Sequence, residues 1–140
     1  MSSLQVPANR DALDSVREFI EIELEDTSCP AKAAYQIDVV IEEIVVNIVD
    51  YSGLTDQDLI EIKTCIEKDP DRITIAFIDA GVTFDPLAAD DPDASEEGLL
   101  SHEGGLGIFM VRKMMDDVAY VRRDGKNIFT IVKNFYQPAK

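Results

Sequence analysis

The sequence predicts an α+β fold, a two-layer sandwich in which helices cover one face of a mixed, mostly antiparallel sheet. Three observations lead to this prediction. Two segments in the first third repeat apolar residues at the three-to-four spacing of a helix, and later segments alternate apolar and polar residues as half-buried strands do. Turn signals join successive strands directly, which makes them antiparallel neighbours. The 140 residues fit one domain, 1–140.

The first part of the chain is predicted to form one short strand and two helices. Residues 4–6 form the strand, and residues 11–25 form an amphipathic helix with apolar positions at Leu13, Val16, Phe19, Ile20 and Ile22. The stretch DTSCPAKAAY then breaks the chain, with Pro30 at the first helical position. The second helix extends to about residue 51, because the helical spacing continues through Ile37, Val40, Ile41, Ile44, Val45 and Ile48.

The rest of the chain is predicted to hold strands at 59–67, 73–78, 118–121 and 128–132 and one helix at 106–115. The first of these strands alternates, with Ile60 and Ile62 on one face, and KDPDR turns the chain into the second. Asp124-Gly125 is a strong hairpin signal between the last two strands. Residues 85–103 are polar and acidic and contain no Lys or Arg.

Composition limits the classes of partner. The formal net charge of −15 argues against nucleic acid or an anionic membrane, although a local set of donors can still bind a nucleotide. Cys29 and Cys65 match no metal or redox spacing and are predicted to be small thiols in a reducing cytosol. No segment has the apolar length of a signal peptide core or a bilayer span, so we expect a cytoplasmic protein.

Three polar residues mark one face of the second predicted helix. Glu43 and Asn47 stand four residues apart and project side by side, and Asp50 follows three residues later. Asparagine is a poor helix former, so Asn47 costs stability unless it has a partner. An amide oxygen and a carboxylate one turn apart are the hard donors that Mg²⁺ accepts. The alternative reading of Glu43 is a solvated helix face shared with Glu42.

Two further segments have the chemistry of a nucleotide site. Asp79 ends an apolar strand and Gly81 permits a sharp turn, so the carboxylate can accept a hydrogen bond from an exocyclic amine such as that of adenine. Gly104, Gly105 and Gly107 open a helix whose first amides lack partners and favour phosphate. The alternative readings are an ordinary strand-end turn and an ordinary helix entry. The glycines lack the Gly-Lys-Ser/Thr ending of a P-loop.

These segments, in this order, resemble the nucleotide-binding boxes of a known family. EEIVVN, DAGVTFDP and GGLGIFMV are similar to the three boxes of the GHKL (Bergerat) ATPase superfamily. The short length, the FDP after the second box and GGLGIFMVRKMMDDVAY resemble the anti-sigma-factor serine kinases of bacterial partner-switching systems. The resemblance covers about residues 4–134 and implies a Bergerat ATP-binding fold with ATP and Mg²⁺ as cofactors.

The resemblance also implies a role for each matching position. Asn47 resembles the asparagine that holds magnesium, Glu43 the glutamate that acts as general base or orients the hydroxyl, and Asp79 the aspartate that reads the adenine amine. Residues 86–104 correspond to the ATP lid. Nucleotide contacts are expected from Asn47, Asp50, Asp79, Gly81, Phe84, Gly104, Gly105, Leu106, Gly107, Ile108 and Thr130.

The function implied by the resemblance is a Mg²⁺- and ATP-dependent serine/threonine protein kinase that is also a binding switch. Its expected substrate is a STAS-domain antagonist, its expected binding partner is a sigma factor or another regulated protein, and a homodimer is expected. A non-catalytic ATP-binding module that sequesters its partner stays open, because Tyr51 stands where these kinases often have histidine. The ATP-binding domain of a sensor histidine kinase is disfavoured, because no phosphoacceptor-histidine helix precedes the first box.

Overall fold

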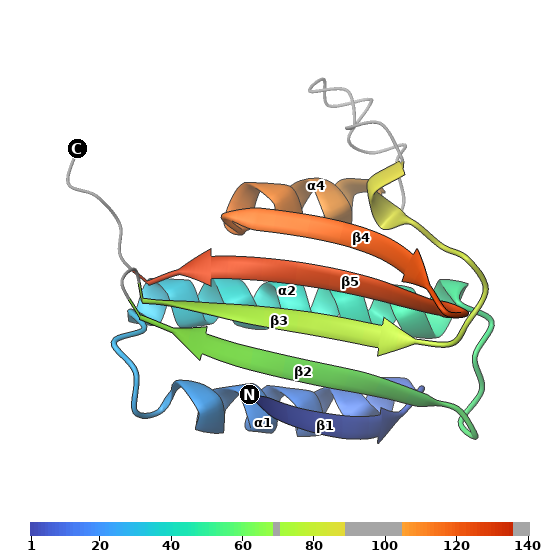
Figure 1. The fold of residues 1–140 in the computed structure, drawn as a ribbon, viewed down its shortest axis with the longest axis horizontal. Helices are drawn as coiled ribbons and strands as arrows, with labels where there is room; N and C mark the ends of the chain where they lie inside the picture. The colour runs from blue at the N-terminus through green and yellow to red at the C-terminus, as the bar shows by residue number, and fades with distance from the viewer. Residues whose placement is uncertain (69–70, 89–104, 136–140) are drawn as a thin grey trace.

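The computed structural model describes residues 1–68, 71–88 and 105–135 (Figure 1). In chain order the elements are β1 (Ser2–Pro7), the 3₁₀ turn η1 (Arg10–Ala12), α1 (Leu13–Leu24), α2 (Ala31–Tyr51), β2 (Leu59–Glu67), β3 (Arg72–Asp79), the 3₁₀ turn η2 (Pro86–Ala88), α4 (Gly105–Met114), β4 (Asp117–Arg123) and β5 (Lys126–Asn134). None of the helices in these ranges has both the length and the apolar character that crossing a membrane requires.

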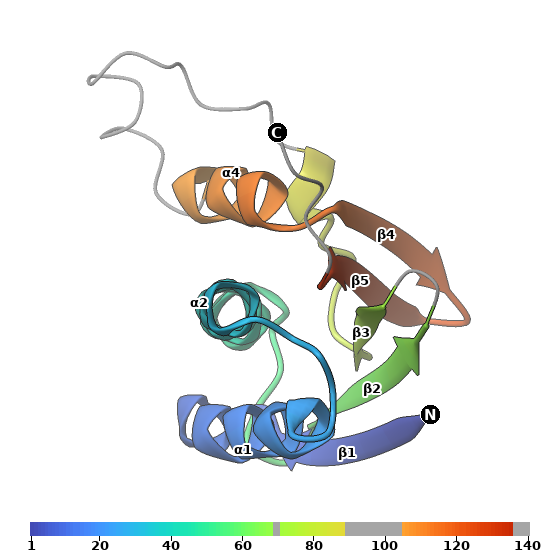
Figure 2. The same cartoon turned by 90° about the vertical axis from the view of Figure 1, so that its left-hand side faces the viewer.

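The strands form one sheet in the order β1-β2-β3-β5-β4. Each pair of neighbours among the described strands is antiparallel, so the parallel component that a mixed sheet allows is not present in them. The three helices α1, α2 and α4 lie together on one face of the sheet (Figure 2). The predicted α+β two-layer sandwich is therefore confirmed.

The core lies between α2 and the sheet. Along α2, the residues at helical spacing that face the sheet are buried: Ile37, Val40, Ile41, Ile44, Val45 and Ile48. On β3 the burial alternates with period two, and Ile73, Ile75 and Phe77 face the helices. Full burial of a side chain of this size contributes about 1.5–3 kcal/mol. The two periodicities in the sequence thus meet at one apolar layer, which fixes the orientation of α2 on the sheet.

Two local predictions need correction at the helix starts. The helix predicted from residue 11 begins as η1, capped by the Asn9 side chain that accepts from the Ala12 amide at 3.0 Å, and α1 follows. Pro30 has extended dihedrals (φ −68°, ψ 154°) and is the N-cap of α2 rather than its first helical residue. The Pro30 carbonyl still accepts the first helical hydrogen bond, from Ala34, which is what a residue at the N-cap does.

The β4–β5 hairpin forms as the sequence predicts. Asp124 and Gly125 both have positive φ, 53° and 77°, which is the requirement of a type I′ turn. The resulting register pairs Arg123 with Lys126 and Arg122 with Asn127. The turn therefore decides which residues of β5 face the helices.

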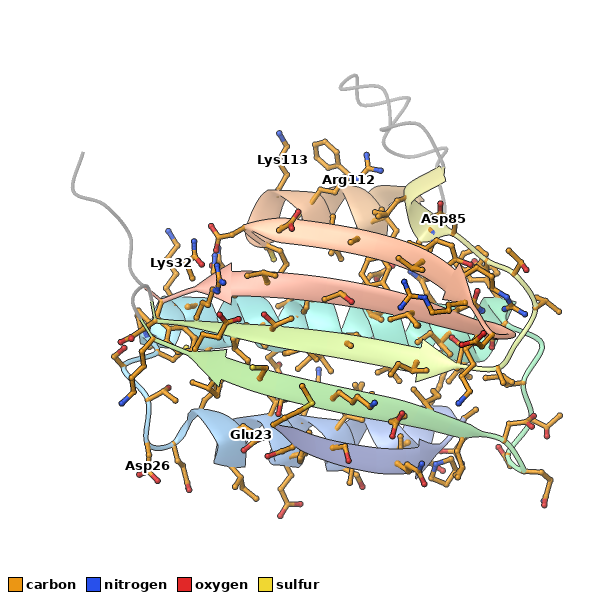
Figure 3. All side chains as sticks on the ribbon, in the orientation of Figure 1. Glu23, Asp26, Lys32, Asp85, Arg112 and Lys113 are labelled. Atoms are coloured by element: carbon orange, nitrogen blue, oxygen red, sulfur yellow. The ribbon has the colours of Figure 1, made fainter. Side chains whose placement is uncertain are left out.

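The last helix is held at two points along its length. The Arg112 guanidinium donates to the Leu87 carbonyl at 2.8 Å, which ties α4 to η2. Figure 3 labels Arg112 on α4 and Asp85 just before η2. The buried ammonium of Lys133 donates to the Met114 carbonyl at 2.7 Å. A cation at the C-terminal end of a helix is favourable because the carbonyl dipoles point there. These contacts hold α4 so that its glycine-rich first turn lies against α2.

Candidate functional site

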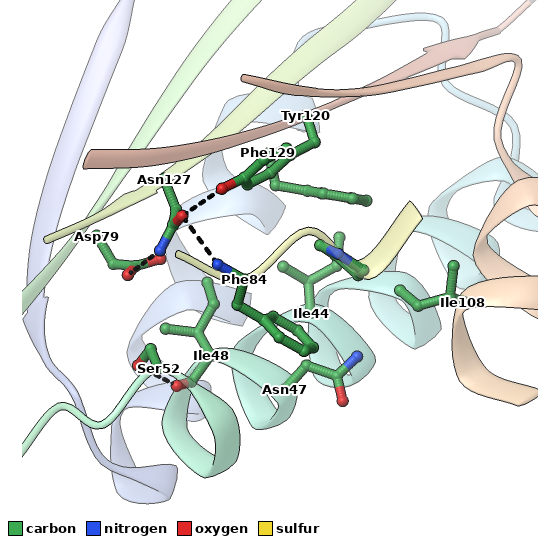
Figure 4. A pocket seen from close by; sticks show the side chains of 11 residues that line it. Ile44, Asn47, Ile48, Ser52, Asp79, Phe84, Ile108, Tyr120, Asn127 and Phe129 are labelled. Carbon is green, nitrogen blue, oxygen red and sulfur yellow. Dashed lines mark hydrogen bonds between the residues drawn. The ribbon is translucent and has the colours of Figure 1, made fainter. Parts of the chain in front are cut away.

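A small pocket lies between the second half of α2 and the strands β3, β4 and β5 (Figure 4). The pocket is lined by Ile44, Asn47, Ile48, Ser52, Asp79, Phe84, Pro86, Ile108, Tyr120, Asn127 and Phe129. The hollow measures about 380 Å³ with its open mouth, but the centre of a water molecule can occupy only about 20 Å³ of it. About 10–15 Å³ of such space holds one water, so the side chains are closely packed here.

Asp79 is the buried carboxylate of this pocket. Its Oδ1 atom accepts two hydrogen bonds, from the Gly81 amide at 2.9 Å and from Asn127 Nδ2 at 3.1 Å. The side chain is only 4% exposed. The other carboxylate oxygen, Oδ2, receives no hydrogen bond from the described residues. It is therefore the atom of Asp79 that can accept a hydrogen bond from a ligand.

Gly81 is required because two chain segments approach each other closely. A Cβ atom at Gly81 would lie 2.5 Å from both Cβ and the carbonyl oxygen of Ser52 and 2.9 Å from Asp79 Oδ1. The next amide, that of Val82, donates to the Ser52 carbonyl at 2.9 Å. The Asp-Ala-Gly turn thus joins the end of β3 to the end of α2, and a side chain at position 81 would force the two apart.

Asn127 is a pocket residue that the sequence prediction missed. It is 4% exposed and faces Asp79 across the β3–β5 pair. In addition to Asp79, its side chain contacts the Val82 carbonyl at 2.8 Å, the Tyr120 hydroxyl at 2.5 Å and the Phe84 amide at 3.3 Å. The signal that could have found it is its place two residues after the Asp-Gly turn. The hairpin places Asn127 near the start of β5, and the pairing of β5 with β3 then sets it directly opposite Asp79.

The structure contradicts the predicted nucleotide contact of Thr130. Along β5 the side chains alternate, and Phe129 and Ile131 are buried toward the helices. Thr130 therefore points to the opposite face of the sheet, where its neighbour across β3 is Ala76. Asn127 and Phe129 are the β5 residues that line the pocket.

Replacing Thr130 with valine is accordingly expected to leave nucleotide affinity unchanged within about twofold. Valine has nearly the same shape and removes only the hydroxyl, which points away from the pocket. Calorimetric titration of the variant with Mg-ATP measures this directly. A tenfold weaker affinity, about 1.4 kcal/mol, would mean that the hydroxyl reaches the nucleotide after all.

The predicted site residues of α2 do not all lie at the pocket. Asn47 is 7% exposed and lines the pocket. Asp50 does not line it: its carboxylate pairs with the Arg10 guanidinium at 2.8 Å and holds η1 against α2. The assignment of Asp50 to the nucleotide site is therefore corrected. Tyr51, at the end of α2, is not a lining residue but stacks on the lining residue Phe84 with ring centroids 5.4 Å apart.

Glu43 lies beneath the first turn of α4 and is not a lining residue of the pocket. A Cβ atom at Gly107 would fall 1.7 Å from Glu43 Oε1 and 2.0 Å from Cδ. The group that comes close to Gly107 is thus the carboxylate of α2. Burial raises the pKa of the Glu43 carboxyl; a hydrogen bond with Asn47 opposes this shift, and the charge of Glu42 adds to it. A carboxylate at the start of a helix also lies in the favourable field of the helix dipole.

The remaining predicted contacts fall at the start of α4. Ile108 lines the pocket, and Gly105 and Leu106 are the first two residues of the helix. Gly104 and most of the predicted lid, residues 89–104, lie outside the described residues. The first three lid residues form η2, which the Arg112–Leu87 contact ties to α4.

The donor set fits a magnesium ion only when nucleotide oxygens complete it. Within the ranges that the structure describes, no group of three or more His, Cys, Asp or Glu side chains could hold a metal. Asn47 and Glu43 together offer an amide oxygen and a carboxylate one helical turn apart. Mg²⁺ usually takes one or two protein oxygens and completes its shell with phosphate and water, so the amide oxygen of Asn47 can serve alone while the Glu43 carboxylate is packed beneath Gly107.

Comparison with known proteins identifies related sequences. A family model described as a histidine kinase-like ATPase domain matches residues 6–133. The serine-protein kinase RsbW of Staphylococcus epidermidis is 31% identical over 97 residues, which cover 66% of this chain and 61% of RsbW. The matched part of the chain thus spans less than two thirds of that relative's length.

Two solved structures share the fold. The RsbU and RsbW domains of Rv1364c from Mycobacterium tuberculosis align with a TM-score of 0.66 at 18% identity, over 100% of this chain and 34% of that one. The SiaB-SiaC complex from Pseudomonas aeruginosa aligns with a TM-score of 0.63 at 14% identity, over 96% and 89%. At these identities the similarity concerns the fold alone.

Proposed function

The chain belongs to the histidine kinase-like ATPase domain family, and from this premise we propose that it is a Mg²⁺- and ATP-dependent serine/threonine protein kinase. The observation that supports the nucleotide site best is the buried Asp79 carboxylate with one oxygen already saturated and the other available. An exocyclic amine such as the 6-amino group of adenine is the matching donor.

The nucleotide would lie along α2, from Asp79 toward the start of α4. Its base would contact Phe129 and Ile108 on the apolar walls of the pocket. Its phosphates would reach the free amides of the first turn of α4, because a helix N-terminus carries a partial positive charge and unpaired N–H groups. Asn47 would hold Mg²⁺, which supplies neutralisation of the phosphate charge when bound.

Binding requires the pocket to widen. Nucleotide-sized sites measure roughly 300–1,000 Å³, whereas the space open to water centres here is about 20 Å³. Phe84 and Pro86 belong to the segment after β3 that covers the pocket, and Phe84 is held by a ring stack and one long amide hydrogen bond. Outward movement of Phe84 breaks this stack and this hydrogen bond, whereas η2 stays tied to α4 through Leu87 and Arg112, so Phe84 is the residue that we expect to move.

The transfer step would use Glu43. The hydroxyl oxygen of the substrate serine or threonine forms a bond to the γ-phosphorus, and the bond from that phosphorus to the β,γ-bridging oxygen breaks. ADP leaves with the electron pair of that bond, and the hydroxyl proton passes to the Glu43 carboxylate. In its packed position burial raises the pKa of Glu43, the direction that makes a carboxylate a better proton acceptor. The carboxylate must first turn out from beneath Gly107.

The proposed protein substrate is a small STAS-domain antagonist. The unphosphorylated antagonist would hold this chain, and the phosphorylated antagonist would release it to bind a sigma factor or another target. Support comes from the relative named serine-protein kinase and from the anti-sigma-type sequence boxes. A homodimer is part of the same proposal. A second candidate, a binding module without catalysis, is favoured by one observation: the Glu43 carboxylate is packed under Gly107.

A radiolabel transfer assay separates the two candidates. The full chain is incubated with γ-labelled ATP, Mg²⁺ and a STAS-domain protein from the same genome. Label on the STAS protein, removed by a serine-to-alanine change at its acceptor, supports the kinase. ATP binding without transfer, together with a stable complex between the two proteins, supports the binding module. Absence of ATP binding overturns both.

Replacing Asp79 with asparagine is expected to weaken ATP binding roughly tenfold or more. The change removes a charge-assisted acceptor, which is worth about 1.5–3 kcal/mol. Calorimetry with ATP and with GTP checks the result, because the affinity for ATP should fall and the affinity for GTP should not. Equal wild-type affinity for ATP and GTP would contradict the assignment of Asp79 to the adenine amine.

A further inference from the structure

Asn127 uses its whole hydrogen-bonding capacity inside the pocket. Its Nδ2 group donates to Asp79 Oδ1 at 3.1 Å and to the Val82 carbonyl at 2.8 Å. Its Oδ1 atom accepts from the Tyr120 hydroxyl at 2.5 Å and from the Phe84 amide at 3.3 Å. Figure 4 shows the bonds of Asn127 with Asp79, Tyr120 and Phe84. An amide side chain has two donor hydrogens and two acceptor lone pairs, so none is left over.

This arrangement permits only one orientation of the amide. If the group were turned by 180°, its oxygen would face Asp79 Oδ1 and the Val82 carbonyl, which are both acceptors. Its nitrogen would then face the Phe84 amide, which is a donor. Acceptor against acceptor and donor against donor leaves buried polar groups unpaired, at a cost of about 1–3 kcal/mol for each. The Tyr120 and Phe84 contacts therefore hold the donor side of Asn127 toward Asp79.

The consequence lies in Asp79. Because Oδ1 receives both the Gly81 amide and Asn127 Nδ2, the carboxylate cannot rotate without losing two hydrogen bonds. We propose that Asn127 is a positioning residue that presents the second oxygen of Asp79 to the ligand and so sets the preference for a purine with a 6-amino group. This inference rests on the proposed nucleotide site and adds to it the residue that determines base selectivity.

The same network extends to the segment that covers the pocket. Asn127 holds the Val82 carbonyl and the Phe84 amide, and the Arg122 guanidinium donates to the Gly81 carbonyl at 2.7 Å. Movement of Phe84 breaks its 3.3 Å bond, whereas the 2.8 Å bond to Val82 and the bond to Asp79 do not involve Phe84. The acceptor geometry of Asp79 is therefore retained while the pocket opens.

The test compares ATP with inosine triphosphate, which carries an oxygen in place of the 6-amino group. Dissociation constants with Mg²⁺ are measured by calorimetry for the wild-type chain, Asn127→Ser, Asn127→Asp, Asp79→Asn and the double variant Asp79→Asn/Asn127→Ser. Thermal melts establish which variants are folded. Ile128→Val, on the same strand with its side chain on the opposite face of the sheet, is the matched control.

We expect Asn127→Ser to weaken ATP binding roughly tenfold and inosine triphosphate binding less than about twofold, so that the preference for ATP collapses. The double variant should prefer ATP over inosine triphosphate to the same extent as Asp79→Asn alone, because both changes remove the same interaction. Asn127→Asp, which has the shape of asparagine but no donor, should behave like Asn127→Ser if it folds.

Equal weakening of both nucleotides by Asn127→Ser, or additive losses in the double variant, would overturn the positioning role and leave Asn127 as a structural contact only. A wild-type chain that binds both nucleotides equally overturns the proposed adenine site instead. The two failures are thus distinguished by the wild-type measurement.

Discussion

Replacing Glu43 with alanine is expected to leave Mg-ATP binding nearly intact and to lower transfer to the protein substrate by a factor on the order of 10²–10⁴. The carboxylate does not line the pocket, so its removal costs the nucleotide little. The Glu43 carboxylate would act on the incoming hydroxyl, so its removal lowers the rate of phosphoryl transfer. Single-turnover transfer of label and calorimetry on the same preparation measure the two effects separately.

The matched control is Glu42→Ala, which removes the neighbouring acid. Glu42 is exposed and pairs with Arg17 at 3.3 Å on the outer side of α2. This variant should transfer at close to the wild-type rate. If Glu43→Ala and Glu42→Ala have the same rate as the wild type, Glu43 is part of an ordinary helix surface and the binding-module candidate gains support.

The pH dependence gives a second readout of Glu43. Because burial raises the pKa of this carboxyl, the unprotonated form needed for proton acceptance appears only above the ordinary glutamate pKa. Transfer should therefore rise with pH through a midpoint above that of a solvated glutamate. The contribution to stability has the opposite sign: it is present below the unfolded pKa and is lost as pH rises through the folded pKa.

The elements could be predicted because their signals are local. The alternation from Leu59 to Glu67 places β2 within its observed bounds, and Asp124-Gly125 fixes a hairpin whose positive φ angles few other pairs adopt. Asp79 and Gly81 were found for the same reason, since a strand end and its turn are adjacent in the chain. Short turns make β2 and β3, and β4 and β5, antiparallel neighbours, whereas the positions of β1 beside β2 and of β5 beside β3 are seen only in the structure.

The errors in the site come from contacts between distant segments. Asp50 shares a helix face with Asn47, but Arg10 lies forty residues earlier and draws its carboxylate away from the pocket. Thr130 has a suitable hydroxyl, yet one residue of register decides which face of the sheet it occupies. Asn127 is recognisable only after β5 is placed opposite Asp79. Local spacing contains none of this information.

Gly107 shows most clearly what the sequence could not tell. Three glycines predict that something approaches the start of the last helix, and phosphate is the chemistry that such a terminus favours. The structure shows a second group near this helix start, because the Glu43 carboxylate occupies the space that a side chain at position 107 would take. Glycine at position 107 can be required by the phosphate, by the Glu43 carboxylate or by both, and a substitution can tell these cases apart.

Gly107→Ala is expected to raise the free energy of unfolding in the Glu43→Ala background but not in the wild-type background. In an open helix, alanine is more stable than glycine by about 0.5–1 kcal/mol. In the wild-type chain the new Cβ atom would lie 1.7 Å from Glu43 Oε1, so the carboxylate must move and the gain is cancelled or reversed. In the Glu43→Ala background that atom is gone, and Gly107→Ala should stabilise the protein. Chemical denaturation of the four proteins in the cycle measures the coupling.

Nucleotide affinity in the same four proteins then separates the two reasons for the glycine. If phosphate also approaches position 107, Gly107→Ala weakens Mg-ATP binding in both backgrounds, because the methyl group obstructs the phosphate whether or not Glu43 is present. If only the carboxylate needs the space, affinity falls in neither background, and transfer in the wild-type background does not fall, because Gly107→Ala turns Glu43 out from beneath α4 as the transfer step requires. An equal change in unfolding free energy in both backgrounds would mean that the carboxylate does not occupy this space in solution, and the packing of Glu43 beneath α4 would have to be abandoned.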